Sequence, residues 1–204
     1  IAHRHGALVV VDDAHGIGTV GPTGRSATEG LSASQRPDVL LGTASKALGV
    51  EGGFACVDET LAILMRNCAR GYVFSSAPSP AVAAAVAAAV KYLRTDTSRV
   101  RKLQANVAQA RRLLAEADLI PPSAAHDRGP IIRIPVGPES RAVAAQEELA
   151  RRGLMVGAIR YPAVARGDAI LRICLTARHT DEHIRILVTS LREVLDGALS
   201  DAPR

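Results

Sequence analysis

Two stretches decide the fold of this chain: VVVDDAHGIGTVGPTGR over residues 9–25 and VLLGTASKALGVEGG over residues 39–53. Each stretch begins with a short apolar run and continues into a polar segment that contains glycine. Runs of this kind are typical of strands that are buried on both faces of a parallel sheet. Ligands bind at the carboxyl ends of such strands, so we expect the chemistry of the protein in the two polar segments.

The rest of the pattern predicts two domains. A third strand over 53–57 is followed by helices over 58–69, 80–94 and 98–117, with Ser98 as the cap of the last and Gly71 as the stop of the first. Past a double proline, strands are expected over 131–136, 154–160 and 170–175, with helices over 139–152 and 181–199. We therefore predict an α/β fold in which residues 1–95 form the later part of a large, mainly parallel domain. Residues 96–204 would form a bridging helix and a small α+β domain.

Composition and charge disfavour several classes of protein. The net charge is +5, but the 25 basic residues are scattered and only five aromatic residues could stack on bases, so we expect no nucleic-acid partner. No uncharged apolar run is long enough for a membrane span. Cys56, Cys68 and Cys174 are isolated in apolar contexts, which predicts reduced, buried thiols in a cytoplasmic protein. The chain opens at Ile1 in the middle of an element, so we expect a preceding portion in the parent protein.

Lys46 is the central candidate for chemistry. It is one of three lysines, beside 22 arginines, and small residues flank it. A surface ion pair with Asp12 would be served at least as well by arginine, whereas only an amine condenses with an aldehyde. A nucleotide triphosphatase would need a GxxxxGK[ST] loop, which is not present, although it could lie upstream. A metal site at Asp12, Asp13 and His15 lacks further ligands, and we expect no metal.

Pyridoxal 5'-phosphate (PLP) accounts for more of these residues than the other interpretations. The carboxylate of Asp12 would pair with the protonated pyridine nitrogen, and His15 could reach the phenolic oxygen of the ring. Hydroxyls for the phosphate would come from Thr43 and Ser45. Lys46 would hold the cofactor as a Schiff base and, once displaced by a substrate amine, act as general base.

The same residues resemble a known family. The runs over 9–25 and 42–53 are similar to the D-[DE]-A-H-[SG]-x-G-x-x-G-x-x-G-R and T-x-[SG]-K-[AG]-x-G patterns of the α-oxoamine synthases, which are fold-type I PLP enzymes. The segment FSSAP over 74–78 resembles the F-S-T-x-x-P segment of the family. AIRYPAVARGDAILRICLTARHT, over 158–180, resembles its C-terminal substrate segment. The likeness covers nearly the whole chain in the order of the family.

The resemblance implies an activity and further site residues. Members condense an amino acid with an acyl-CoA or acyl thioester and release CO2. Arg172 and Arg160 would bind substrate, with Arg172 on the carboxylate. Ser76 would reach the cofactor phosphate of a neighbouring subunit, which implies a homodimer with shared active sites.

Specificity within the family stays open at this stage. The segment that begins with Ala158 favours L-alanine and a pimeloyl thioester, as in biotin biosynthesis, with the glycine-using C-acetyltransferases as the alternative. A truncated binding protein without catalysis is the alternative from another class. The ring-stacking histidine and the glycine-rich phosphate loop of the family are expected upstream, so we expect this chain alone to bind PLP poorly and to catalyse little.

Overall fold

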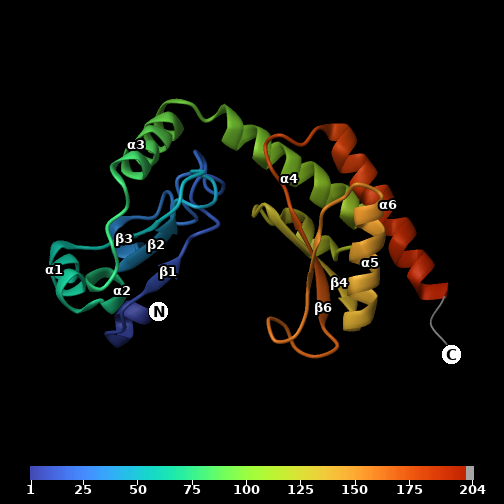
Figure 1. Cartoon of the computed structure of the whole chain (residues 1–204), viewed down its shortest axis with the longest axis horizontal. Coiled ribbons are helices and arrows are strands. Elements are labelled where there is room, and N and C mark those ends of the chain that lie inside the picture. Colours follow the sequence, from blue (N-terminus) through green and yellow to red (C-terminus); the bar gives the residue numbers. More distant parts are fainter. Residues whose placement is uncertain (201–204) are drawn as a thin grey trace. The chain divides into compact units, whose positions relative to one another are not determined.

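A computed structural model describes residues 1–200, with side chains to residue 197. Contacts between residues divide the chain into two compact units, Ile1–Val100 and Arg101–Arg204 (Figure 1). The division falls inside helix α4 (Ser98–Glu116). The assignment of residues 1–95 and 96–204 to a large and a small domain stays a prediction.

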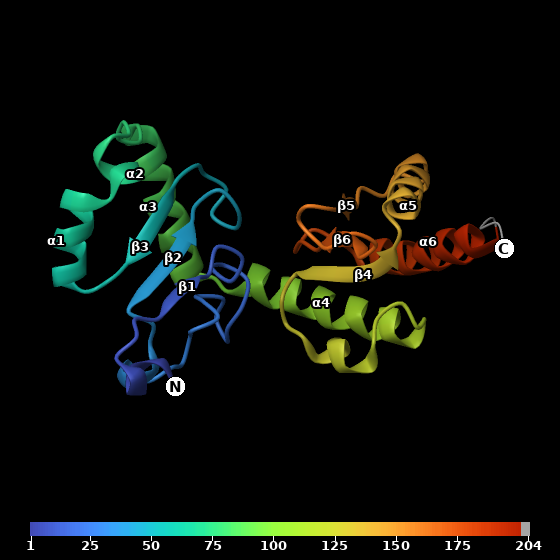
Figure 2. The ribbon, with the colours of Figure 1, turned by 90° about the horizontal axis from the view of Figure 1, so that it is seen from below.

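The N-terminal unit contains a three-stranded sheet in the order β1-β2-β3, whose strands lie side by side in Figure 2. Strand β1 (Val10–Asp12) pairs in parallel with β2 (Val39–Thr43), and β3 (Gly53–Cys56) pairs antiparallel with β2. The expected parallel pairing is therefore confirmed for β1 and β2. Strand β3 is antiparallel to β2.

Burial of this sheet on both faces was predicted wrongly. Val10 is 59% exposed, and all four residues of β3 are exposed. The physical reason is that none of the helices within residues 1–100 packs extensively against the sheet. The apolar runs therefore identify strands correctly while overstating how much of each strand is covered here.

Local capping explains the helices of this unit. The Asp58 carboxylate accepts a hydrogen bond from Leu61 N (2.8 Å) and begins α1 (Glu59–Cys68). Ser79 accepts from Val82 N (3.3 Å), and a proline follows it in the first turn of α3 (Pro80–Thr95). One expected helix stop acts differently from our prediction. Gly71 lies inside the short helix α2 (Arg70–Val73) instead of ending α1, because α1 already ends at Cys68.

The C-terminal unit is a three-stranded antiparallel sheet covered on one face by helices. The sheet has the order β4-β6-β5, and all three strands were expected from the sequence. Its elements are β4 (Ile131–Gly137), α5 (Glu139–Arg151), β5 (Gly157–Ile159), β6 (Ala169–Cys174) and α6 (Asp181–Ser200). The described residues also form three short 3-10 helices, η1 (Ala2–His5), η2 (Ala33–Gln35) and η3 (Pro122–His126). Helix α4 begins at Ser98 itself, whose N–H donates to the Asp96 carboxylate (2.7 Å), so Ser98 is not the cap.

A single hydrophobic cluster fills the space between this sheet and its helices. Alternate residues of β4 and β6, including Ile132, Ile134 and Leu171, are buried against α4, α5 and α6. Helix α6 begins where Thr180 Oγ1 accepts a hydrogen bond from His183 N (3.2 Å). Its predicted apolar face is confirmed, since Ile184, Leu187, Leu191 and Leu195 are buried and Val188 packs against the cluster.

The cysteines differ from the sequence prediction. Cys56, Cys68 and Cys174 are free thiols, and all three are exposed rather than buried. Cys56 is exposed because the sheet around it is uncovered, and Cys174 lies at the end of β6. Among the described residues, no helix combines the length and the apolar character that a membrane crossing requires.

Asn106 links α4 to the turn that precedes α6. Its fully buried side chain donates from Nδ2 to the carbonyls of Thr176 (2.9 Å) and His179 (2.8 Å). We expect Asn106→Ala to lower the unfolding free energy of the C-terminal unit by about 2–3 kcal/mol, because the two hydrogen bonds of the buried Asn106 amide are lost. Hydrogen exchange of the β4 and β6 amides measures this loss. Asn67→Ala, at an exposed site, is the control, and equal protection in both variants would contradict the prediction.

His179 makes the stability of this unit depend on pH. Burial, and secondarily the neighbouring His183, lower the pKa of His179. The unfolded pKa is higher, so protonation favours unfolding, and stability present above about pH 6.5 is lost as the pH falls. We expect His179→Asn to flatten this loss between about pH 7.5 and 5.5 in urea titrations. The exposed His126→Asn is the control; an unchanged slope in His179→Asn would show that other groups cause the loss.

Candidate active site

The carboxyl ends of β1 and β2 meet at one edge of the N-terminal sheet. Because the strands are parallel and Asp12 pairs with Leu41, the segments that follow Asp12 and Thr43 leave the sheet on the same side. Asp12 is exposed there, and its Oδ1 accepts a hydrogen bond from Ala14 N (3.0 Å). This edge is therefore where the predicted carboxylate and hydroxyl groups gather.

The two neighbouring aspartates have different surroundings. Asp13 is buried, its N–H donates to Leu41 O (2.9 Å), and its Oδ2 accepts from Ala27 N (3.1 Å). A Cβ added to Gly16 would lie 1.9 Å from Asp13 Oδ1, so the turn folds directly over this carboxylate. Asp13 thus holds the 13–27 segment in place, whereas Asp12 remains accessible to a ligand. The sequence analysis assigned the pyridine nitrogen to Asp12 and not to Asp13, and that role remains a prediction; the anchoring contacts of Asp13 were not predicted.

Lys46 is exposed on a compact loop between β2 and β3. Backbone hydrogen bonds close this loop, from Ala44 N to Gly52 O and from Val50 N to Ala44 O (both 2.9 Å). Thr43 Oγ1 lies 3.0 Å from Gly52 O and 2.7 Å from Ser45 Oγ. The structure therefore brings the two hydroxyls predicted to bind phosphate into contact, next to Lys46 in the chain.

The turn that carries His15 touches the loop that carries Lys46. A Cβ added to Gly18, whose φ is +77°, would lie only 2.4 Å from Ala47 Cβ. His15 is exposed three residues before this contact, and Lys46 directly precedes Ala47. Only a residue without a side chain allows the two segments to approach so closely. Gly18 was not among the predicted site residues, although it stands in the glycine-rich pattern of the first stretch.

A cavity of about 360 Å³ lies beside this contact. Its walls are mainly apolar, and two guanidinium groups are part of its lining. The lining residues are Ile17, Gly18, Thr23, Gly24, Arg25, Leu48, Phe54, Val90, Leu93 and Arg94.

The remaining predicted residues are Ser76, in the N-terminal unit, and Arg160 and Arg172, in the C-terminal unit. Ser76 lies in an exposed segment after α2. Arg160 is exposed beyond β5, and Arg172 is half-buried on β6, both in the C-terminal unit. Their predicted roles remain proposals.

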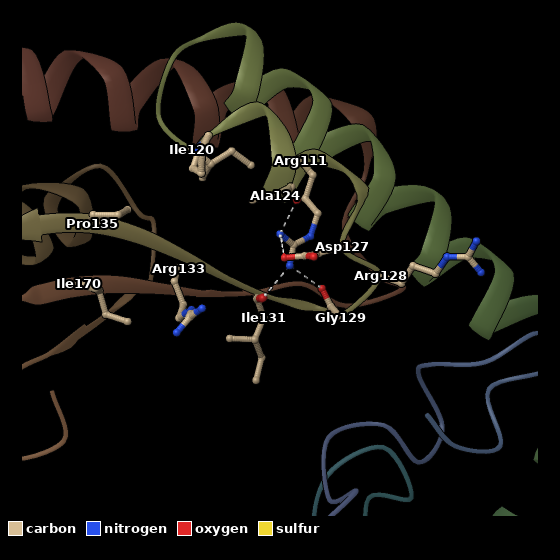
Figure 3. Close-up of a pocket in the computed structure, with 11 residues that line it drawn as sticks. Arg111, Ile120, Ala124, Asp127, Arg128, Gly129, Ile131, Arg133, Pro135 and Ile170 are labelled. Atoms are coloured by element: carbon tan, nitrogen blue, oxygen red, sulfur yellow. Dashed lines mark hydrogen bonds and ion pairs between the residues drawn. The ribbon is translucent and has the colours of Figure 1, made fainter. Parts of the chain in front are cut away.

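The C-terminal unit has a separate pocket of about 540 Å³ next to β4 (Figure 3). Arg111 is buried there and donates to the carbonyls of Ala124 (3.0 Å), Gly129 (3.2 Å) and Ile131 (3.0 Å). Burial lowers the pKa of the Arg111 guanidinium, although Asp127, 3.5 Å away, acts in the opposite direction. Sequence reasoning missed Arg111, because nothing in its helical pattern marks it as a buried clamp.

The residues at the sheet edge fit PLP. An exposed carboxylate, paired hydroxyls and an exposed amine stand at the ends of adjacent parallel strands, where ligands of such sheets bind. The neighbours of Lys46, Ser45 and Ala47, are small, so a bulky ring can approach the backbone. Together with His15, these side chains include a possible partner for the pyridine nitrogen, the phenolic oxygen, the phosphate and the aldehyde of the cofactor.

Comparisons with known proteins agree with this assignment. The chain is 95% identical over its full length to the biotin biosynthesis bifunctional protein BioWF of Cutibacterium acnes, of which it covers 31%. It is 42% identical over 99% of its length to an 8-amino-7-oxononanoate synthase of Halorhodospira halophila, of which it covers 50%. The chain thus spans half or less of the length of these relatives.

Solved structures and a family match give the same result. A serine palmitoyltransferase from S. paucimobilis superposes with a TM-score of 0.86 at 25% identity, over 98% of this chain and 50% of that chain. The 8-amino-7-oxononanoate synthase of Francisella tularensis superposes with a TM-score of 0.79 at 26% identity, over 93% of this chain and 55% of that chain. Residues 1–191 match a family described as aminotransferase class I and II. With its fold-type I PLP-transferase architecture, the chain belongs to the aminotransferase class I and II family.

Proposed function

We propose that this chain is the cofactor-anchoring and C-terminal part of a PLP-dependent C-acyltransferase of biotin biosynthesis. The parent enzyme would join the α-carbon of L-alanine to the acyl carbon of a pimeloyl thioester, with release of the free thiol and of CO2. The observation that carries the proposal is the contact between Gly18 and Ala47, which joins the Asp12–His15 turn to the Lys46 loop. Relatives named for biotin biosynthesis and for 8-amino-7-oxononanoate synthase support the choice of reaction.

Each residue at the sheet edge has a role in this proposal. The Asp12 carboxylate would hold the proton of the pyridine nitrogen, and His15 would bind the phenolic oxygen. Thr43 and Ser45 donate hydrogen bonds to phosphate oxygens. When bound, PLP supplies an electron sink for the carbanion at the substrate α-carbon. Lys46 anchors the cofactor covalently and moves a proton at that α-carbon.

Substrate binding and assembly complete the proposal. Arg172, assisted by Arg160, binds the substrate carboxylate through charge-assisted hydrogen bonds. Ser76 contributes to the phosphate site of a second subunit in a cytoplasmic homodimer. In this assignment residues 1–95 belong to the large domain and residues 96–204 to the bridging helix and small domain.

The anchor can be identified chemically. We expect borohydride reduction of the full-length parent with PLP, followed by digestion and mass analysis, to give an adduct on Lys46. Lys91 and Lys102 are internal controls, since both are exposed on helices. Lys46→Arg keeps the charge and should abolish the adduct, because a guanidinium does not condense with the aldehyde. An adduct on Lys91 or Lys102 alone, or none in the folded parent, would remove the central claim and favour a protein without catalysis.

The close contact at Gly18 predicts a second effect. In the parent, we expect Gly18→Ala to weaken PLP binding about tenfold or more, because the new methyl group displaces the Lys46 loop. Gly30→Ala is the matched control: Gly30 also has a positive φ (+88°), but nothing lies within 4 Å of an added Cβ. Absorbance titration with PLP measures both variants. Equal weakening in the two would indicate backbone strain alone and would contradict the role of the contact.

A further inference from the structure

The C-terminal sheet has a second face, opposite the hydrophobic cluster. On β4 this face carries Ile131, Arg133 and Pro135, which alternate with the buried Ile132 and Ile134. Strand β6 adds Ile170 and Arg172 to the same face, because these residues pair with Pro135 and Arg133. Figure 3 shows the side chains of Ile131, Arg133 and Ile170 on the side of the strands away from α4.

Two guanidinium groups stand next to each other on this face. Arg133 and Arg172 are direct partners in the antiparallel register of β4 and β6. Side chains at such positions have Cβ atoms about 5 Å apart, and like charges there destabilise the sheet. Among residues 1–197, whose side chains the structure describes, neither guanidinium makes an ion pair or a side-chain hydrogen bond. The repulsion is therefore left uncompensated by the protein.

Space beside the pair is left open by a glycine. On the other side of β6, Gly157 pairs with Arg172, and a Cβ built on it would lie 3.9 Å from Arg172 Cβ. The flanking pair, Pro135 and Ile170, is apolar. No side chain at Gly157 covers the two guanidinium groups, and the flanking Pro135–Ile170 pair carries no charge. An anion therefore has access to both groups.

The pocket next to β4 adds to the positive charge around Arg133. Three arginines line it, Arg111, Arg128 and Arg133, together with a single carboxylate. That carboxylate, Asp127, is already 3.5 Å from Arg111 Nη1 (Figure 3). The charge of Arg133 contributes to lowering the pKa of Arg111, so the two groups share one electrostatic environment. Nothing in the pocket neutralises Arg133.

We propose that Arg133 supplies a second guanidinium to the substrate-carboxylate site in which Arg172 was placed above, so that the two cross-strand partners bind the carboxylate together. Each guanidinium can donate two parallel hydrogen bonds, so a pair can surround both carboxylate oxygens. The bound anion removes the repulsion between the strands, and binding is strengthened by that relief. The identity of the ligand rests on the proposed function, while the site itself rests on the register of the sheet. Arg133 is then a substrate-binding residue, in addition to Arg172 and Arg160.

Acetate carries a carboxylate, whereas acetamide carries a neutral amide in its place. The two compounds therefore test the site in the 204-residue chain. We expect the Nε–H signals of isotope-labelled Arg133 and Arg172 to shift with one common midpoint on addition of acetate, at constant ionic strength. Acetamide should leave both signals in place. In Arg133→Gln, the acetate midpoint of Arg172 should rise about tenfold. Arg185→Gln, at an exposed position of α6 without an ion pair, is the charge-matched control and should leave the midpoint unchanged.

The unfolding temperature of Arg133→Gln and the acetate affinity of Arg133→Lys distinguish anion binding by Arg133 from a merely structural role of this residue. Without acetate, Arg133→Gln should unfold at the same temperature as the parent chain or higher, because like-charge repulsion is removed. Arg133→Lys keeps the charge but loses the planar fork, and should recover only part of the acetate affinity. An Arg172 response that is unchanged in Arg133→Gln, or a loss of stability that acetate does not affect, would overturn the inference. Because Lys46 takes no part in this measurement, either result is independent of the borohydride experiment.

Discussion

The parallel pairing of β1 with β2 is the constraint on which the candidate site depends. It places Asp12 and Thr43 at the same edge of the sheet, and the segments that follow them must then share the space beyond that edge. Asp13 fixes the first segment through Ala27, and hydrogen bonds across Ala44 and Gly52 fix the second. The two segments can touch only because position 18 has no side chain. Strand direction, and not the sequence distance between Asp12 and Lys46, brings the candidate residues together.

The sequence was sufficient to predict the order of elements and the main candidate residues. Short apolar runs and capping residues act locally in the sequence. The strands expected at 39–41 and 131–136 and the helix expected at 80–94 therefore each lie within an observed element. The burial of Asp13 could not be predicted in the same way, because it depends on the hydrogen bond that its carboxylate accepts from Ala27 N, fourteen residues further along the chain. Burial of β3 and of the cysteines also depends on distant packing, and it was predicted wrongly.

In the C-terminal unit, the surroundings of charged residues likewise depend on distant packing and could not be predicted from the sequence. Arg172 could be singled out from the pattern of the substrate segment, but Arg133 and Arg111 could not. Arg111 is buried because three backbone carbonyls converge on it, and these come from a loop whose path the sequence does not reveal. Arg133 gains its importance from a partner on another strand, 39 positions away in the sequence, through the register of β4 and β6. Cross-strand register is the information that the sequence lacks.

The uneven distribution of buried side chains has a thermodynamic consequence. The single hydrophobic cluster consists of residues between Leu103 and Leu195, whereas the buried apolar residues of the N-terminal unit are Ala44, Leu48 and Val100. Cooperative, all-or-none melting requires a shared core, and the hydrophobic cluster of the described residues lies within the C-terminal unit. A single midpoint or unfolding free energy therefore does not describe the whole chain. Calorimetry would record a sharp transition from the C-terminal half and a broad, weak one from the half that carries Lys46.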